Sequence, residues 1–243
     1  MLGIGAGSSP VVTSMHNQGY LSFNGSDESI NIDNLAGTVD YLTFSCSAWF
    51  KVNTTSATMQ IFKVMVDSSN LLVIQYHAGG DEIRANSKLG GVADVLNQGS
   101  NSIENDGNWH HAVFVVDKSG NDNSILYIDG SATETISGVG TLSGTFNAMS
   151  IGQNTEDGGF WNGAIDEVAF WNRVITPAEV TTIYSAGSTD YPGSIDLTGP
   201  LGTRLIGYYR FEEKEGTVAI NDGSGGNGTL VNTPTYAIHR NSV

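Results

Sequence analysis

The residues best suited to catalysis are two neighbouring acids, Asp166 and Glu167, inside the apolar segment 164–171. Glycoside hydrolysis needs two carboxylates that face the same bond, and alternate residues of a β-strand share a face. Neighbouring strand residues point to opposite faces, so we expect this pair to be unable to act together. Asp166 is therefore predicted to be a buried carboxylate that caps or braces a turn.

Two neighbouring histidines, His110 and His111, raise the question of a metal site. The same alternation places them on opposite faces of a strand, so one ion cannot bind both. We expect one of them to fill a half-buried structural position. No Gly-x-Ser-x-Gly elbow is present, and the sequence indicates no Ser–His–Asp set. The sequence favours a non-catalytic role, with a divergent glycoside hydrolase as the last alternative.

Composition limits the remaining functions. The chain has 10 Lys+Arg against 25 Asp+Glu, a formal net charge of −15. Nucleic acid is held by clustered Lys and Arg, so it is excluded as a partner. A single cysteine, Cys46, excludes an internal disulfide framework, and no Cys/His spacing fits structural zinc. No 18-residue apolar stretch occurs, so no membrane partner is expected.

Short apolar/polar alternations separated by turn residues recur through most of the chain, which predicts strands rather than helices. Asn24-Gly25 and Asp129-Gly130 have the composition of tight turns. The clearest predicted strands are residues 20–23, 42–52, 60–66, 71–76, 109–116, 124–128, 149–152 and 164–171.

One helix is predicted over residues 176–185. Thr176 is its N-cap, Pro177 occupies the first helical position, and Glu179 completes a capping box. We expect this short helix to pack across the rim of a β-sandwich.

Four short segments and one longer one resemble the laminin-G-like group of concanavalin-A-like jelly rolls, with a further likeness to pentraxins. Together they span roughly residues 19–186, and the longest segment has the strand-then-helix order typical of the group's closing part. The resemblance implies an all-β fold: a two-sheet antiparallel jelly-roll sandwich with one short helix. The matching segments are Gly19–Gly25, Phe44–Trp49, Trp109–Val113, Leu126–Gly130 and Asn162–Tyr184.

The domain organisation predicted from this resemblance has four parts. Residues 1–18 form an N-terminal arm, 19–186 the jelly roll, 187–204 a linker, and 205–243 a C-terminal strand unit. Segment 205–236 resembles the opening strands of the same family, yet it follows the closing helix. This order indicates a circular permutation or strand exchange, and we expect 205–212 to pair with the sandwich in cis or in trans.

The resemblance also implies a calcium cofactor, because a hard ion takes carboxylate, amide and backbone oxygens from loops. The loop after Ile151-Gly152-Gln153 looks like the pentraxin calcium loop, and a hairpin turn falls where that family supplies its other ligands. The serines between Asp67 and Asn70 and the altered acid order of the loop depart from the pentraxin pattern. Two solvated polar loops remain the alternative. The candidate ligands are Asp67, Asn70, Asn154, Glu156 and Asp157.

Glycan binding would need polar loop groups and an exposed aromatic ring for stacking. Phe160 and Trp161 follow the Asp157-Gly158-Gly159 loop and are the candidates for that ring, although core packing is the favoured alternative for Trp161. Trp49 and Trp171 stand in core-like alternations and are expected to be buried.

An Asn/Gly/Ser-rich, Lys-poor chain is typical of extracellular proteins, yet Met1–Pro10 lacks the positive charge of a secretory signal. We therefore predict a virion component, a capsid decoration, fibre or spike subunit, which oligomerises or contacts other virion proteins. Such a subunit would also bind cell-surface glycans. The alternative is a secreted or surface-displayed, calcium-dependent carbohydrate-binding module of the lectin kind.

Overall fold

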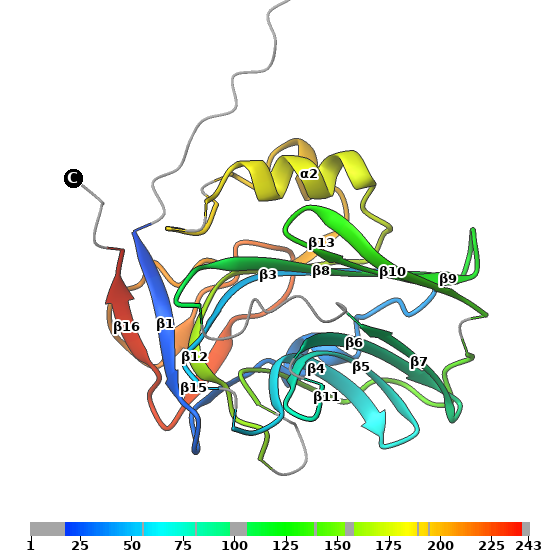
Figure 1. Cartoon of the computed structure of the whole chain (residues 1–243), viewed down its shortest axis with the longest axis horizontal. Helices are drawn as coiled ribbons and strands as arrows, with labels where there is room; N and C mark the ends of the chain where they lie inside the picture. The colour runs from blue at the N-terminus through cyan, green and yellow to red at the C-terminus, as the bar shows by residue number, and fades with distance from the viewer. Residues whose placement is uncertain are drawn as a thin grey trace, which may run out of the picture.

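The computed structural model describes residues 18–239 apart from 55, 81, 98–105, 139, 154–157, 189 and 194. Within these residues the chain forms two antiparallel sheets of eight strands each, packed face to face. The predicted all-β jelly-roll sandwich is confirmed (Figure 1). Of the predicted arm, only Gln18 is described.

Sheet I has the strand order β10-β9-β8-β3-β12-β1-β16, and β13 also pairs with β12. Sheet II has the order β14-β15-β2-β11-β4-β5-β6-β7. The strands of sheet I are β1 (Gly19–Asn24), β3 (Thr43–Val52), β8 (His110–Asp117), β9 (Asn123–Ile128), β10 (Ser131–Ser137), β12 (Asn162–Trp171), β13 (Leu205–Tyr209) and β16 (Thr235–Ile238). Those of sheet II are β2 (Ser29–Asn31), β4 (Met59–Asp67), β5 (Asn70–His77), β6 (Glu82–Leu89), β7 (Val92–Asn97), β11 (Ala148–Ile151), β14 (Val218–Ala219) and β15 (Gly228–Val231).

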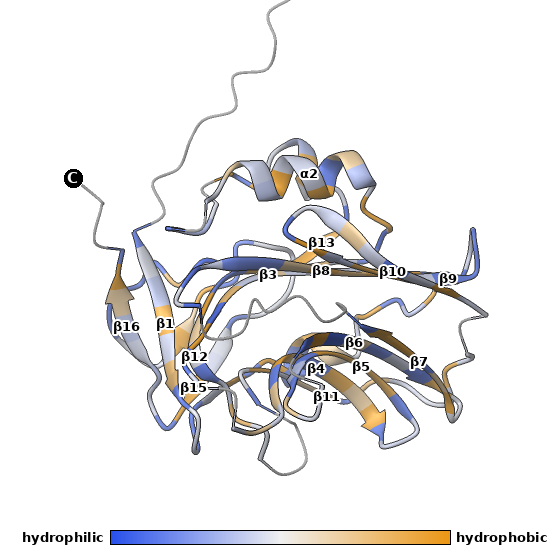
Figure 2. Cartoon of the chain, viewed as in Figure 1, coloured by the Kyte–Doolittle hydropathy of each residue, from blue (hydrophilic) through white to orange (hydrophobic). Residues whose placement is uncertain are grey.

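The main core fills the space between the two sheets. Alternate residues of each strand point inward, so every second position of the central strands is apolar and buried. Phe44, Phe62 and Phe170 join the sheets, with ring centroids 4.9–6.3 Å apart. Hydrophobic residues accordingly concentrate in the strands (Figure 2).

A second apolar layer covers the outer face of sheet I. Helix α2 (Pro177–Ser185) lies on this face, not across the rim as the sequence suggested (Figure 1). Val180 and Ile183 of α2 pack on Val113 and Trp171 of the sheet. The predicted capping box is present, since Thr176 accepts from the Glu179 backbone and the Glu179 carboxylate accepts from the Thr176 backbone.

The segment predicted as a linker contributes to this second layer. Leu197 is buried there, and the indole of Trp171 donates to the Leu201 carbonyl oxygen at 2.9 Å. The segment includes a short 3₁₀ helix, η1 (Pro200–Gly202), and a second α-helix, α1 (Asp33–Ala36), stands earlier in the chain. No helix in the described parts of the chain is both long and apolar enough to cross a bilayer.

The C-terminal strands belong to both sheets of the same chain. In sheet I, β13 pairs with β12 and β16 pairs with β1. In sheet II, β15 pairs with β2 and β14 pairs with β15. Residues 205–238 are therefore part of the sandwich itself.

Candidate functional site

The acid pair of β12 lies at a β-bulge. The pairing of β12 with β3 shifts register between Asp166 and Ala169, and Glu167 has a φ of 49°. A bulge interrupts strict alternation, and here both carboxylates reach groups on the outer side of sheet I. The prediction that they point to opposite faces is therefore wrong, because alternation holds only in a regular strand.

Both carboxylates are nevertheless closed to substrate. Asp166 is 0% exposed and Glu167 is 4% exposed. Asp166 Oδ1 accepts from the Glu167 backbone N–H at 2.9 Å, and Asp166 Oδ2 lies 3.2 Å from His239 Nε2. The interpretation of Asp166 as a buried, turn-bonding carboxylate is confirmed.

Glu167 joins two side chains that come from the C-terminal segment. Its carboxylate accepts from the Tyr208 hydroxyl and lies 3.5 Å from Arg210 Nε. Burial, and then repulsion from Asp166, holds the pKa of Glu167 well above its ordinary range. The cluster ties β12 to β13, and it offers no open carboxylate for glycan hydrolysis.

The two histidines lie on opposite sides of β8, as alternation predicts. His110 contacts Asp129 Oδ2 at 2.8 Å and Asp106 Oδ2 at 3.2 Å. His111 Nε2 lies 2.7 Å from the Ser47 hydroxyl, and burial lowers the pKa of His111 to about 4. Both are buried structural residues, whereas the sequence predicted a half-buried position for one.

The turn proposed for calcium is braced internally. Asp67 Oδ1 accepts from the Ser69 backbone at 2.7 Å and from Asn70 Nδ2 at 3.0 Å. Asn70 Oδ1 accepts from the backbone N–H groups of Gly90 and Ser143, both at 2.9 Å. The side-chain amide oxygen of Asn70 thus already accepts two backbone hydrogen bonds, which disfavours this atom as a calcium ligand.

The other candidate ligands, Asn154, Glu156 and Asp157, lie outside the described residues. Their described flanks meet the Gln60 end of β4, where the Gln60 N–H donates to the Gly159 carbonyl oxygen at 2.9 Å. Asp67 stands seven residues further along β4, roughly 23 Å away at the usual rise of a strand. The described residues do not bring the two predicted halves of the site together.

Of the two candidate stacking residues, Trp161 is in the core. Its side chain is 0% exposed, packs edge-on against Phe50, and donates from Nε1 to the Ala164 carbonyl oxygen at 3.3 Å. The prediction of a stacking platform at Trp161 is wrong, because the ring faces the inside of the sandwich. Phe160 is half-buried and stays a candidate.

The outer face of sheet II carries a set of polar side chains that the sequence did not single out. We call it the polar face and define it by Gln60, Gln75, Arg84, Asn86, Lys88 and Asn97. Strand register places Gln60, Gln75, Arg84 and Asn97 in one row across β4–β7. Cross-strand neighbours stand about 5 Å apart, so several of these groups can contact one ligand.

Strand β6 shows why these residues share a face. Ile83, Ala85 and Leu89 are buried in the core, so the alternate residues Arg84, Asn86 and Lys88 project outward. The signal was present in the sequence as a polar residue at every second position of 84–88. It was missed because the segment is too polar to stand out as a strand.

The chemistry of the polar face suits a ligand rich in hydroxyl groups. Gln60 Nε2 donates to Gln75 Oε1 at 3.3 Å, and Arg84 pairs with Glu82 at 2.7 Å. The side-chain oxygens of Asn86 and Asn97 are buried and have no hydrogen-bond partner among the described residues, so they do not face a ligand in this conformation. The side chains of Gln75, Arg84, Asn86 and Lys88 are partly exposed, and amide, guanidinium and ammonium groups are usual polar contacts of a sugar site.

The comparison with protein families decides the fold family. A model described as the concanavalin A-like lectin/glucanases superfamily matches residues 24–181, more than half of the chain. The chain belongs to this superfamily. The comparison with curated protein sequences gave no match.

Several solved structures share the fold of this superfamily member. A candidate carbohydrate-binding protein from Bacteroides ovatus is 14% identical with a TM-score of 0.68, and the match covers 93% of this chain and 61% of that one. A heptameric pentraxin from Limulus polyphemus is 17% identical with a TM-score of 0.56, covering 88% and 95%. The CBM40 module of a Ruminococcus gnavus sialidase is 9% identical with a TM-score of 0.56, covering 68% and 97%. At these identities the likeness shows a common fold.

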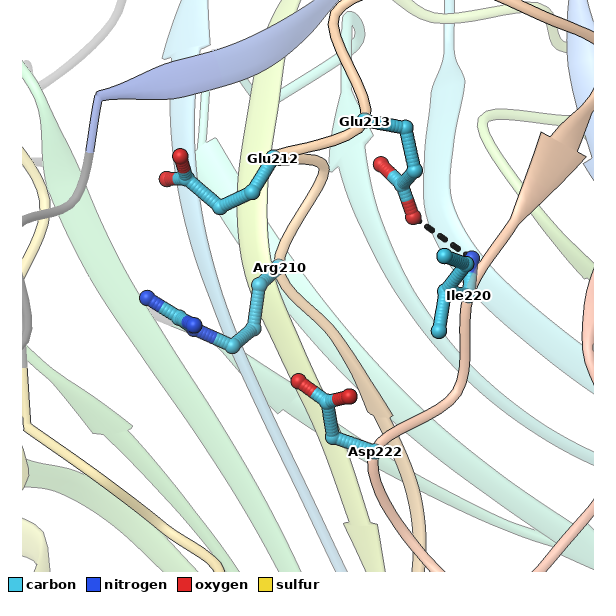
Figure 3. Close-up of a pocket in the computed structure, with 5 residues that line it drawn as sticks. All are labelled: Arg210, Glu212, Glu213, Ile220 and Asp222. Atoms are coloured by element: carbon cyan, nitrogen blue, oxygen red, sulfur yellow. Dashed lines mark hydrogen bonds between the residues drawn. The ribbon is translucent and has the colours of Figure 1, made fainter.

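This chain also has a hollow of about 160 Å³ beside its C-terminal strands (Figure 3). Arg210, Glu212, Glu213, Ile220 and Asp222 line it. Its volume is below the 300–1,000 Å³ usual for ligand pockets. Glu213 Oε1 already accepts from the Ile220 backbone at 2.6 Å, and Glu212 Oε1 from Gln18 at 2.8 Å. The hollow is therefore a weaker candidate than the polar face.

Proposed function

We propose that this chain is a non-catalytic carbohydrate-binding module whose polar face holds the glycan. The observation that carries the proposal is the row of Gln60, Gln75, Arg84 and Asn97, with Asn86 and Lys88 beside it, on one side of sheet II. A sheet face with several amides and cations can form many hydrogen bonds to sugar hydroxyls without a deep pocket.

The fold neighbours support the same ligand class. The Ruminococcus gnavus module is bound to α2,3-sialyllactose, and the Bacteroides ovatus protein is a candidate carbohydrate-binding protein. The burial of Asp166 and Glu167 supports the non-catalytic part, because the acid pair identified in β12 is closed to substrate.

Phe160 is proposed to complete the site as its stacking ring. It follows Gly159, whose carbonyl oxygen bonds Gln60 at one end of the row. Calcium binding by Asn154, Glu156 and Asp157 remains part of the proposal, since these residues closely precede Gly159 and Phe160 in the sequence.

A glycan array followed by calorimetric titration tests the proposal. We expect the wild-type chain to bind at least one glycan class, and Gln75→Ala combined with Arg84→Ala to weaken binding by tenfold or more, because each lost hydrogen bond is worth about 1 kcal/mol. The matched control combines Gln18→Ala with Arg204→Ala, an amide and an arginine away from the polar face, and keeps the wild-type affinity. Equal affinity of the two double variants, or no binding by the wild type, would contradict the proposal.

We further propose that this module is displayed on a virion, as a capsid decoration, fibre or spike subunit, with secretion to a cell surface as the alternative. The acidic composition supports a hydrated particle surface. Val218, Ile220 and Ile238 expose 45–62% of their surface near two sheet edges and would suit a subunit contact. Mass spectrometry of purified virus particles tests the virion proposal. Absence of this chain from every particle fraction would refute the proposal.

A further inference from the structure

Three buried polar atoms near the β7 end of the sandwich have no hydrogen-bond partner among the described residues. They are Ser87 Oγ, Asp94 Oδ2 and Ser124 Oγ. Ser87 is 1% exposed, Asp94 6% and Ser124 0%. Buried polar groups are normally satisfied, so each of these atoms requires a partner that the described residues do not supply.

The strand geometry places the three side chains in the space between the sheets. Asp94 lies opposite Ser87 in the β6–β7 pairing. Ser87 alternates with the core residues Ala85 and Leu89, and Asp94 with the core residue Leu96. Each therefore points inward from sheet II.

Ser124 points inward from the opposite sheet. It alternates with Leu126 and Ile128 of β9, which both belong to the core. Strands β6 and β7 contact β9, where the two sheets approach each other. The carboxylate of one sheet and the hydroxyl of the other therefore share one end of the sandwich.

The charge of Asp94 also lacks a close counterion among the described residues. Burial is the first cause that raises its pKa, and the negative charge of Asp122 is the second. The positive charge of Lys118 lowers the pKa of Asp94, but the Lys118 Nζ binds Asp122 Oδ1 at 3.1 Å. Asp117 is committed to its own turn, where it accepts from Gly120 and Asn121.

We propose that Ser87, Asp94 and Ser124 form an inter-sheet site for a hard metal cation, with Asp122 as a further oxygen ligand from the adjacent turn. All four groups offer oxygen atoms, and carboxylates with hydroxyl and water oxygens are what calcium takes. A cation supplies both the missing partners and the missing charge, whereas water supplies only the partners. The proposed ligands do not include any residue of the calcium loop predicted from the sequence, and the site does not depend on glycan binding.

Thermal unfolding of the full chain tests the site, with calcium chloride as the probe and a chelator as the reference. At a hundredfold excess over Kd we expect the wild-type Tm to rise by about 5 °C or more, because a ligand that binds the native state stabilises it. Asp94→Asn keeps the shape of the side chain and removes the charge, so the part of the calcium-dependent rise that comes from this site is lost. Ser124→Ala is expected to weaken calcium binding about tenfold through the loss of one ligand.

Two control variants separate this site from the other calcium candidates. Asp67→Asn removes the exposed carboxylate of the turn between β4 and β5, and Glu156→Gln with Asp157→Asn removes the loop acids. Both are expected to retain the part of the rise that Asp94→Asn abolishes. The proposal is overturned if wild type shows no rise with calcium, if Asp94→Asn retains the full rise, or if Asp94→Asn is simply more stable in chelator and calcium alike. The last result would identify a buried carboxylate without a bound ion.

Discussion

Glu167 illustrates how a single residue can look catalytic in sequence and be structural in the fold. Its left-handed φ of 49° turns its carboxylate toward Tyr208 and Arg210. A buried carboxyl group of this kind is tolerated only when it is hydrogen-bonded, and its ionised form only when it is also paired with a cation. The C-terminal segment supplies both partners, so the acid that resembles a catalytic group attaches that segment to β12.

The Tyr208 hydroxyl should therefore contribute to stability. Tyr208→Phe removes the donor to the Glu167 carboxylate and leaves the Ile195 carbonyl oxygen, 3.1 Å from the hydroxyl, without this contact. We expect a loss of about 1–3 kcal/mol in the free energy of unfolding, measured by urea denaturation. Tyr191→Phe, at a residue 44% exposed, is the control and should change stability by less than about 0.5 kcal/mol. Equal effects of the two variants would exclude the role of this hydroxyl.

His111 should make the fold sensitive to acid. Burial lowers its folded-state pKa to about 4, while the unfolded chain titrates near the ordinary 6.5. Between pH 4 and pH 6.5, unfolding is therefore accompanied by uptake of a proton. The contribution of His111 to the free energy of unfolding is present above pH 6.5 and is lost as the pH falls toward 4. The expected slope is about 1.4 kcal/mol per pH unit.

Denaturation at several pH values compares His111→Asn with wild type. The variant should show a flatter loss of stability between pH 6.5 and 4, and His77→Asn should keep the wild-type slope. An unchanged slope in His111→Asn would show that other groups cause the acid sensitivity.

At the scale of elements, the sequence predicted the strands whose inner positions are regularly apolar and missed those where they are not. β3, β4, β5, β8 and β12 were each predicted to within two residues at either end. β6 and β7 were not predicted, because Ser87 and Asp94 stand at inward positions and interrupt the apolar alternation. These two strands carry much of the polar face and of the inter-sheet cluster, so the pattern was least informative where function is proposed.

The helix boundary was predictable because capping is local chemistry. Thr176→Ala removes the acceptor for the Glu179 backbone N–H and should cost about 1 kcal/mol, measured as a lower urea midpoint. Thr176→Ser retains the hydroxyl and should stay close to wild type. If both variants lose the same stability, the capping bond is not the cause.

The whole molecule shows what local patterns cannot reach. The resemblance predicted the sandwich, but the order of the strands depends on long-range pairing. Strand β1 lies between β12 and β16, and its residue Gly19 pairs with Ile238, which is 219 residues later in the sequence. For the same reason the sequence did not show that Asp67 and the described flanks of the 154–157 loop meet opposite ends of β4. Trp161 failed because a ring that follows a loop can still turn into the core.

Glycan binding at the polar face of sheet II can be mapped from the amide chemical shifts of the isotope-labelled chain during titration with its best glycan. We predict that the largest shifts fall on β4–β7, at and beside Gln60, Gln75, Arg84, Asn86 and Asn97, and that amides around Asp166 and Glu167 do not move. Shifts confined to another face of the sandwich, such as the hollow at Arg210, would show that the polar face is not the glycan site.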